Sequence, residues 1–138
     1  MTTSLQLRRS LAHPPGQVWR AFTDPGALAG WFWPARFATT AEVDLRVGGR
    51  YRIASAAAGM AVSGHYLHVE PPARLVFTWR WDGDADESLV TIEFGPTGTG
   101  TDVVITHERL IGDHDRDNHA QGWEACLDRL PGWLSACR

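Results

Sequence analysis

The residue best suited to acid–base chemistry is a histidine on a predicted strand. Residues 101–110 alternate with a period of two, so His107 shares a face with Val103 and Ile105 and is expected to point into the core. A histidine titrates near neutral pH and can act as a general base, which makes His107 the candidate catalytic residue. A core histidine that is hydrogen-bonded to its neighbours is the alternative interpretation. Glu108 falls on the opposite face and cannot pair with His107 without a bulge.

Aromatic side chains on the same predicted face indicate a binding cavity. Residues 75–81 place Trp79 and Trp81 together, and ligand pockets are mostly apolar with a few polar groups. This face carries more aromatic bulk than one helix is expected to cover. The candidate ligand-binding residues are Tyr51, Ile53, Trp79, Trp81, Ile92, Ile105, His107, Trp123 and Trp33. For each of these residues, packing in an ordinary hydrophobic core is the alternative interpretation. The aromatic residues 31–33 could form the rim of the cavity, a surface that binds a partner, or a short helix packed on the edge of the sheet.

An acidic run near the C-terminus raises the question of a metal. Asp113, Asp115, Asp117 and Glu124 stand at positions 1, 3, 5 and 12 of a calcium-binding loop. Position 6 is Asn118 rather than glycine, and the preceding segment is predicted as a strand rather than a helix. We therefore predict no metal site and no cofactor. The run is interpreted as an acidic segment that leads into the last helix. Carboxylates near a helix N-terminus stabilise the helix by capping it and by interacting with its dipole.

The elements that must position these residues can be predicted from periodicity. Strands are expected at residues 5–11, 41–45, 50–55, 60–70, 75–81, 88–94 and 101–110, with a turn at 95–100, and short helices begin at Pro15 and Pro25. The last helix carries an apolar stripe, and Pro131 is expected to bend or break it. The stripe consists of Trp123, Leu127, Leu130 and Leu134.

This order of elements predicts an α+β fold. Successive strands with hairpin-length connections form an antiparallel sheet. We expect a curved antiparallel sheet of about six or seven strands, wrapped around a long C-terminal helix, with two short helices after the first strand. Residues 1–138 are expected to form a single domain.

Composition excludes several classes of protein. The chain has 138 residues and a formal net charge of −3, so we expect no nonspecific nucleic-acid binding, which needs a basic field. No apolar run approaches the roughly 20 residues of a membrane span, and no secretory leader is evident, so we expect a cytoplasmic protein. Cys126 and Cys137 lie about 16 Å apart on one predicted helix and are not expected to pair.

Several short motifs occur in an order that resembles a known superfamily. They are Pro15-x-x-Val18-Trp19-x-Ala21-Phe22-Thr23-Asp24-Pro25, Trp31-Phe32-Trp33-Pro34, Asp44-x-Arg46-x-Gly48-Gly49-x-Tyr51, Pro71-Pro72-x-x-Leu75, Phe77-Thr78-Trp79, Thr106-His107 and Gly122-Trp123. Together they resemble the START-like, or SRPBCC, superfamily with its helix-grip fold. More narrowly, the chain is similar to the C-terminal domain of the activator of Hsp90 ATPase. The resemblance implies a cavity between the long helix and the sheet.

The resemblance leads to one main functional hypothesis and two alternatives. The first is binding of a hydrophobic or lipid-like small molecule in the cavity. The second is a cyclase or isomerase activity in the same cavity. The third is stimulation of an Hsp90-type ATPase in a stress response, although Hsp90 activators carry an additional N-terminal domain for which this chain has no room. The expected partners are the small molecule, a chaperone under the third hypothesis, and a second copy of the chain in a homodimer.

Overall fold

The structure is a computed structural model that describes residues 2–136, and it contains one sheet and four helical segments. In chain order the elements are β1 (Thr2–Leu11), α1 (Pro15–Thr23), α2 (Pro25–Trp31), the 3-10 helix η1 (Ala35–Phe37), β2 (Thr40–Val43), β3 (Arg50–Ser55), β4 (Met60–Glu70), β5 (Arg74–Trp81), β6 (Ser88–Thr97), β7 (Gly100–Ile111) and α3 (Gly112–Ala136). The predicted α+β helix-grip fold is confirmed.

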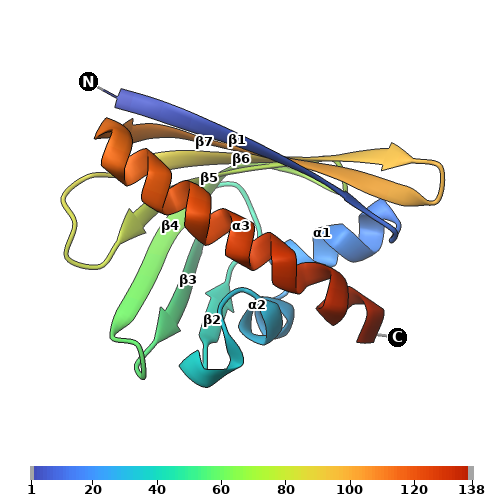
Figure 1. The fold of residues 1–138 in the computed structure, drawn as a ribbon, viewed down its shortest axis with the longest axis horizontal. Coiled ribbons are helices and arrows are strands. Elements are labelled where there is room, and N and C mark those ends of the chain that lie inside the picture. The colour runs from blue at the N-terminus through green and yellow to red at the C-terminus, as the bar shows by residue number, and fades with distance from the viewer. Residues whose placement is uncertain (1, 137–138) are drawn as a thin grey trace.

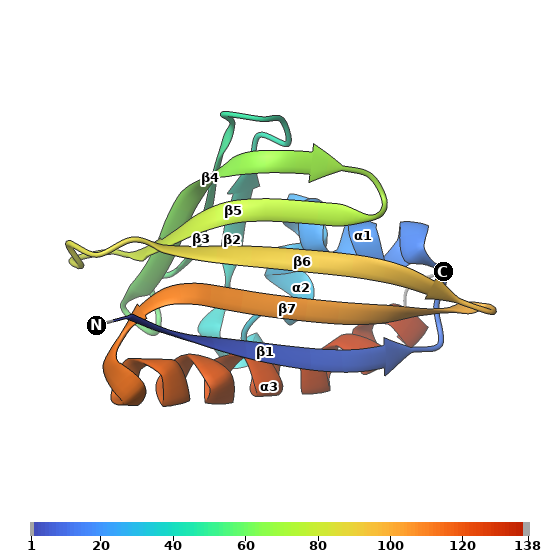
Figure 2. The same ribbon diagram turned by 90° about the horizontal axis from the view of Figure 1, so that it is seen from above.

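The sheet is antiparallel throughout, with the strand order β1-β7-β6-β5-β4-β3-β2. Strands β2 to β7 follow one another as hairpins, and β1 pairs with β7 at the far edge. Figure 2 shows β5, β6, β7 and β1 lying side by side above α3. Helix α3 crosses one face of the sheet, and α1 and α2 lie near its C-terminal half (Figure 1).

The short helices form where the sequence provides their end signals. Both begin with a proline in the first turn, where the missing backbone N–H is not needed. Asp24 ends α1 and caps α2, because its carboxylate accepts a hydrogen bond from the Ala27 backbone N–H at 2.9 Å. This tight corner turns α2 under α3 and places residues 31–33 in the interior.

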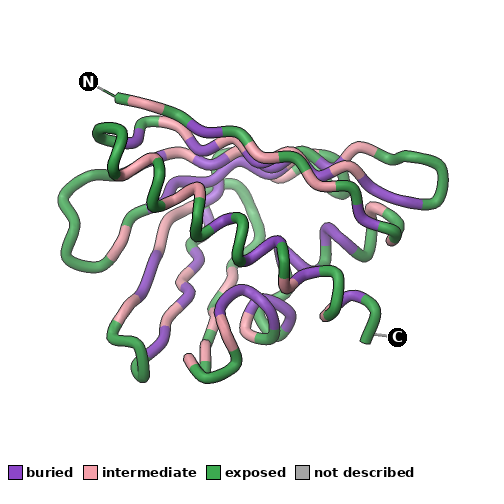
Figure 3. Tube along the Cα trace, viewed as in Figure 1, coloured by how far each residue is buried: buried purple, intermediate pink, exposed green. Residues whose placement is uncertain are grey.

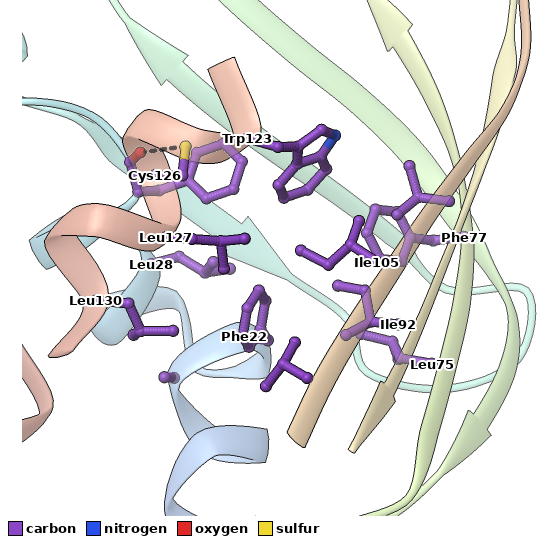
Figure 4. Packing of buried hydrophobic residues seen from close by; sticks show 14 of the residues in the cluster. Phe22, Leu28, Leu75, Phe77, Ile92, Ile105, Trp123, Cys126, Leu127 and Leu130 are labelled. Carbon is purple, nitrogen blue, oxygen red and sulfur yellow. Dashed lines mark hydrogen bonds between the residues drawn. The ribbon is translucent and has the colours of Figure 1, made fainter. Parts of the chain in front are cut away.

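The core lies between the sheet and the helices (Figure 3). Leu127 and Leu130 of α3 are buried against apolar side chains of α1, α2 and the sheet, as Figure 4 shows for Phe22, Leu28 and Ile92. Alternating strand residues such as Val103 and Ile105 are completely buried. The apolar stripe predicted for the last helix is therefore its core-facing side.

Some sequence-based boundaries were wrong. The segment 95–100 is not a turn throughout, because β6 and β7 stay paired up to Thr97 and Gly100, which leaves Gly98 with a φ of 56° in the tight turn. Residues 113–119 belong to α3 rather than to a lead-in. Helix α3 also continues through Pro131 without the break that was one expected outcome, because burial of Leu130 and Leu134 anchors both sides of the proline.

Candidate functional site

A groove of about 500 Å³ runs along one side of α3. On α3 it is lined by Asp115, Asn118, His119, Gly122, Trp123, Ala125, Cys126 and Arg129. These positions recur at the three- and four-residue spacing of one helix face, and the first and last are about 21 Å apart along the axis. The facing wall is formed by Phe32, Trp33, Pro34, Phe37, Met60, Trp79 and Trp81. The groove therefore opens where α3 passes the start of β4, the end of β5 and the segment between α2 and β2 (Figure 1).

Aromatic rings form most of the wall that faces α3, and Trp123 adds one from the helix itself. The rings of Trp33 and Trp81 are stacked, with centroids 6.2 Å apart and an interplanar angle of 12°. Trp79 meets Trp81 edge-on at 5.4 Å and Trp123 at 5.3 Å. Trp33 is held in place because the cap of α2 turns the chain inward, and it is 7% exposed. Such walls offer flat apolar surface to a ligand at little cost in side-chain entropy.

His119 is the main polar group of the aromatic part of the groove. Its Nε2 accepts a hydrogen bond from the indole N–H of Trp81 at 3.0 Å, and its Nδ1 lies 2.7 Å from the carbonyl oxygen of Asp115. Because Nε2 is the acceptor, this network assigns the proton of the neutral ring to Nδ1. The pair formed by Trp81 and His119 also separates the groove from a smaller pocket of about 250 Å³ on the other side.

His107 lies behind the groove and is completely buried. Its Nδ1 accepts a hydrogen bond from the Trp123 indole N–H at 3.0 Å, and its Nε2 is 2.7 Å from the hydroxyl of Ser88, which donates to the Trp79 carbonyl at 3.2 Å. Both ring nitrogens therefore have partners. Burial, together with the smaller effect of the neighbouring His119, lowers the pKa of His107 to about 3. The ring is neutral at physiological pH.

The space deeper between α3 and the sheet is almost filled. A void of about 20 Å³ remains there, lined by Tyr51, Ile53 and Phe77 among others. That volume is close to what a single water molecule needs. The hydroxyl of Tyr51 donates to the Thr78 carbonyl oxygen at 2.6 Å, and burial raises the pKa of Tyr51 well above its ordinary value. Figure 4 shows Leu127, Ile105 and Phe77 occupying this region.

The structure divides the nine predicted binding residues into three groups. Trp33, Trp79, Trp81 and Trp123 line the groove together. Tyr51 and Ile53 line the small deep void, which Trp79 and Trp123 also border. The remaining predicted residues are completely buried and border neither space; they are Ile92, Ile105 and His107.

The sequence-based prediction missed the polar residues of α3. His119, Asn118 and Arg129 line the groove but were not proposed as binding residues. The sequence does carry a signal for them, which is a second stripe of residues at helical spacing beside the apolar stripe. This stripe can be recognised only if the last helix is taken to begin at Gly112. Met60 and Phe37 were also missed, because strand pairing brings Met60 of β4 to the groove and the short helix η1 places Phe37 there, and neither follows from local sequence.

Cys126 lies in the groove wall as a protonated thiol. Its sulfur donates to the Phe32 carbonyl oxygen at 2.8 Å, the contact dashed in Figure 4, and burial raises its pKa to about 12. Cys137, the other cysteine, falls outside the described residues. Among residues 2–136 no group of three or more His, Cys, Asp or Glu side chains is placed to hold a metal ion. None of the helices in this range combines the length and the apolar character that a membrane-spanning helix needs.

Comparison with known families identifies the chain. The sequence profile of the family described as activator of Hsp90 ATPase homolog 1-like protein matches residues 12–135. The chain belongs to this family. Comparison with the curated proteins finds no match.

Solved structures show the same family fold. The protein CV1439 from Chromobacterium violaceum is 34% identical, with a TM-score of 0.82 over 95% of this chain and 96% of that one. CalU16 from Micromonospora echinospora is 30% identical, with a TM-score of 0.77 over 97% of this chain and 77% of that one. An Hsp90 activator from Plasmodium falciparum is 24% identical, with a TM-score of 0.81 over 96% of each chain, and that similarity concerns the fold.

Proposed function

We propose that this member of the activator of Hsp90 ATPase homolog 1-like family binds a hydrophobic small molecule in the groove along α3. The observation that supports the proposal most strongly is the coincidence of volume and lining. About 500 Å³ falls within the usual range of ligand pockets, and four tryptophans line the space.

The interior between α3 and the sheet is filled and the groove beside α3 is open, and this difference determines where the ligand would lie. The deep void of about 20 Å³ is too small for an organic molecule, so the ligand is assigned to the space between Trp33, Trp81 and Trp123. Ligand binding there would cover the part of the aromatic surface that borders the groove, to which the half-buried Trp81 contributes along with the more deeply buried Trp33 and Trp123. Asn118 supplies hydrogen-bonding groups at one end, whereas both ring nitrogens of His119 already have partners within the chain.

The proposal assigns no proton transfer to His107. The nitrogen that could accept a proton already accepts the N–H of Trp123, and burial holds the pKa of the ring near 3. A general base works best when its pKa lies near the operating pH. The hydrogen bonds to Trp123 and Ser88 instead support a role for His107 in fixing the Trp123 wall of the groove.

The test is binding of a neutral fluorescent probe, N-phenyl-1-naphthylamine, followed by its fluorescence increase and by energy transfer from tryptophan. We expect saturable binding with one site. Ala125→Phe places a ring in the groove and should weaken binding at least about tenfold, because one ring removes much of the available apolar contact.

Gln121→Phe is the matched control, because Gln121 is exposed on α3 and outside the groove lining. It should leave the affinity unchanged. Absence of saturable binding to the wild-type chain, or equal effects of the two phenylalanine variants, would overturn the proposal. Thermal melting of both variants shows whether the fold is retained.

A further inference from the structure

One end of the groove holds a cation whose side-chain position is fixed by backbone groups. The Arg129 Nε donates to the Trp31 carbonyl oxygen at 3.1 Å, and one terminal nitrogen, Nη2, donates to the Phe32 carbonyl oxygen at 2.6 Å and lies 3.7 Å from the Cys126 sulfur. These bonds hold the guanidinium at the C-terminal end of α2. A guanidinium has five N–H donors, and the two on Nη1 make no hydrogen bond to any group in residues 2–136.

This cation has no acidic counterpart in the described part of the chain. The ion pairs of residues 2–136 involve other arginines or His119, and none includes Arg129. The other residues that line the groove are mostly apolar, and Arg129 contacts two of them, Phe32 and Cys126. Charge interactions are stronger beside low-dielectric walls than in open water. Arg129 is therefore a half-buried positive charge that faces a mostly apolar groove.

The other end of the groove has the opposite charge. Asp115 lines that end, about 21 Å from Arg129 along α3. This separation exceeds the Debye length at physiological salt, so the two charges scarcely interact and each acts on its own end of the groove. Behind Trp81 and His119, the smaller pocket adds Asp84, Asp86 and Glu87 against one arginine, Arg109. An anionic group is repelled at this end and attracted at the Arg129 end. The groove thus carries a charge gradient along its length.

We propose that the ligand is an elongated amphipathic anion, with an apolar aromatic or alkyl body between the tryptophans and a carboxylate, or a comparable acidic group, on Arg129. The proposal rests on the function proposed above and adds the charge and direction of the ligand. The free Nη1 hydrogens can both be directed at one acidic group, and the carbonyl contacts hold the guanidinium ready for it.

The test compares two probes that share one skeleton. 8-Anilinonaphthalene-1-sulfonate carries an acidic group that N-phenyl-1-naphthylamine lacks. We expect the wild-type chain to bind the sulfonate about tenfold more tightly or better, as a charge-assisted hydrogen bond would give. Arg129→Gln keeps a hydrogen-bond donor for the carbonyl groups and removes the charge, so it should abolish this preference, which is read as the ratio of the two probe affinities within the same variant. Arg129→Lys should retain part of the preference.

The outcomes separate this inference from the proposed function. If neither probe binds, the proposed function itself fails. If both probes bind with equal affinity to the wild-type chain and Ala125→Phe weakens both, the groove is a site for neutral ligands and the assignment of Arg129 is overturned. A preference for the sulfonate that survives Arg129→Gln also overturns it, because the anion then lies elsewhere. If Arg129→Gln does not fold, equal affinities in the wild-type chain still overturn the assignment, and a wild-type preference that is unchanged in Arg129→Lys overturns it as well, whereas a reduced preference in that variant supports it.

Discussion

The buried ring of His107 should make the protein lose stability as the pH falls. Burial lowers the pKa of His107 to about 3 in the folded chain, against about 6.5 in an unfolded one. The unfolded state therefore binds a proton first, and the stabilisation is present above pH 6.5 and lost as the pH falls toward 3. At 1.36 kcal/mol per pKa unit the full difference is about 5 kcal/mol, of which about 2 kcal/mol is lost between pH 8 and pH 5.

Urea unfolding of the wild-type chain and of His107→Gln, each at several pH values from 8 to 5, measures the contribution of His107 to the free energy of unfolding. Glutamine keeps one donor and one acceptor for Ser88 and Trp123 but does not titrate. The variant should be less stable at neutral pH, because it loses ring packing against Trp79. The difference in unfolding free energy between the two proteins should shrink by about 2 kcal/mol at pH 5, since the other titrating groups cancel.

A constant difference across the pH range would refute this reasoning. It would mean that His107 titrates alike in both states and is not held in its neutral form. An NMR titration of the His107 ring in the wild-type chain gives the same answer without a variant. The ring signals should not move between pH 8 and pH 5.

Three further predictions concern single side chains. Gly64→Ala should destabilise the chain by about 1–3 kcal/mol or more in urea unfolding, because its Cβ would lie 2.0 Å from the Thr78 carbonyl oxygen. Gly132→Ala, whose Cβ would enter open space on α3, should stabilise the chain by up to about 1 kcal/mol, and equal effects of the two variants would contradict this prediction. Trp81→Phe removes the N–H that binds His119 and should cost about 1 kcal/mol in the same assay, and an unchanged stability would show that this bond contributes nothing. Cys126 should be alkylated by iodoacetamide at pH 8 at least about a hundredfold more slowly in the folded than in the unfolded chain, measured on its tryptic peptide, and equal rates would contradict a buried thiol.

The fold could be predicted because its signals are local and agree with one another. Alternation in residues 75–81 and 101–110 marks strands with one buried face, and prolines and glycines mark their ends. What local sequence did not determine was the length of the last hairpin. Pro96 and Gly95 are typical turn residues, yet they continue β6, because pairing with Thr101 and Asp102 extends the ladder to the tip.

The site was harder to predict because it depends on where space remains. Strand alternation correctly places Ile92 and Ile105 on the inner face, but it cannot distinguish a side chain that lines a groove from one that fills the core. That distinction depends on the position of α3, which is set by burial of Leu127, Leu130 and Leu134 together. The helix N-terminal to Trp123 has no such stripe and carries polar residues toward the sheet. The groove forms along that part of the helix.

This division of α3 explains why one helix can both close a core and leave a groove. From Leu127 to Leu134 the side chains that face the sheet are leucines, which interdigitate with α1, α2 and the strands and leave almost no void. From Asp115 to Gly122 the corresponding positions carry polar or small residues, which cannot fill the space in front of Trp79 and Trp81. Replacing Gly122 and Asn118 by leucine should therefore extend the filled core into the groove. The double variant should be at least as stable as the wild-type chain in thermal melting and should bind N-phenyl-1-naphthylamine at least about tenfold more weakly. Retained probe affinity in a stable double variant would show that the probe binds elsewhere.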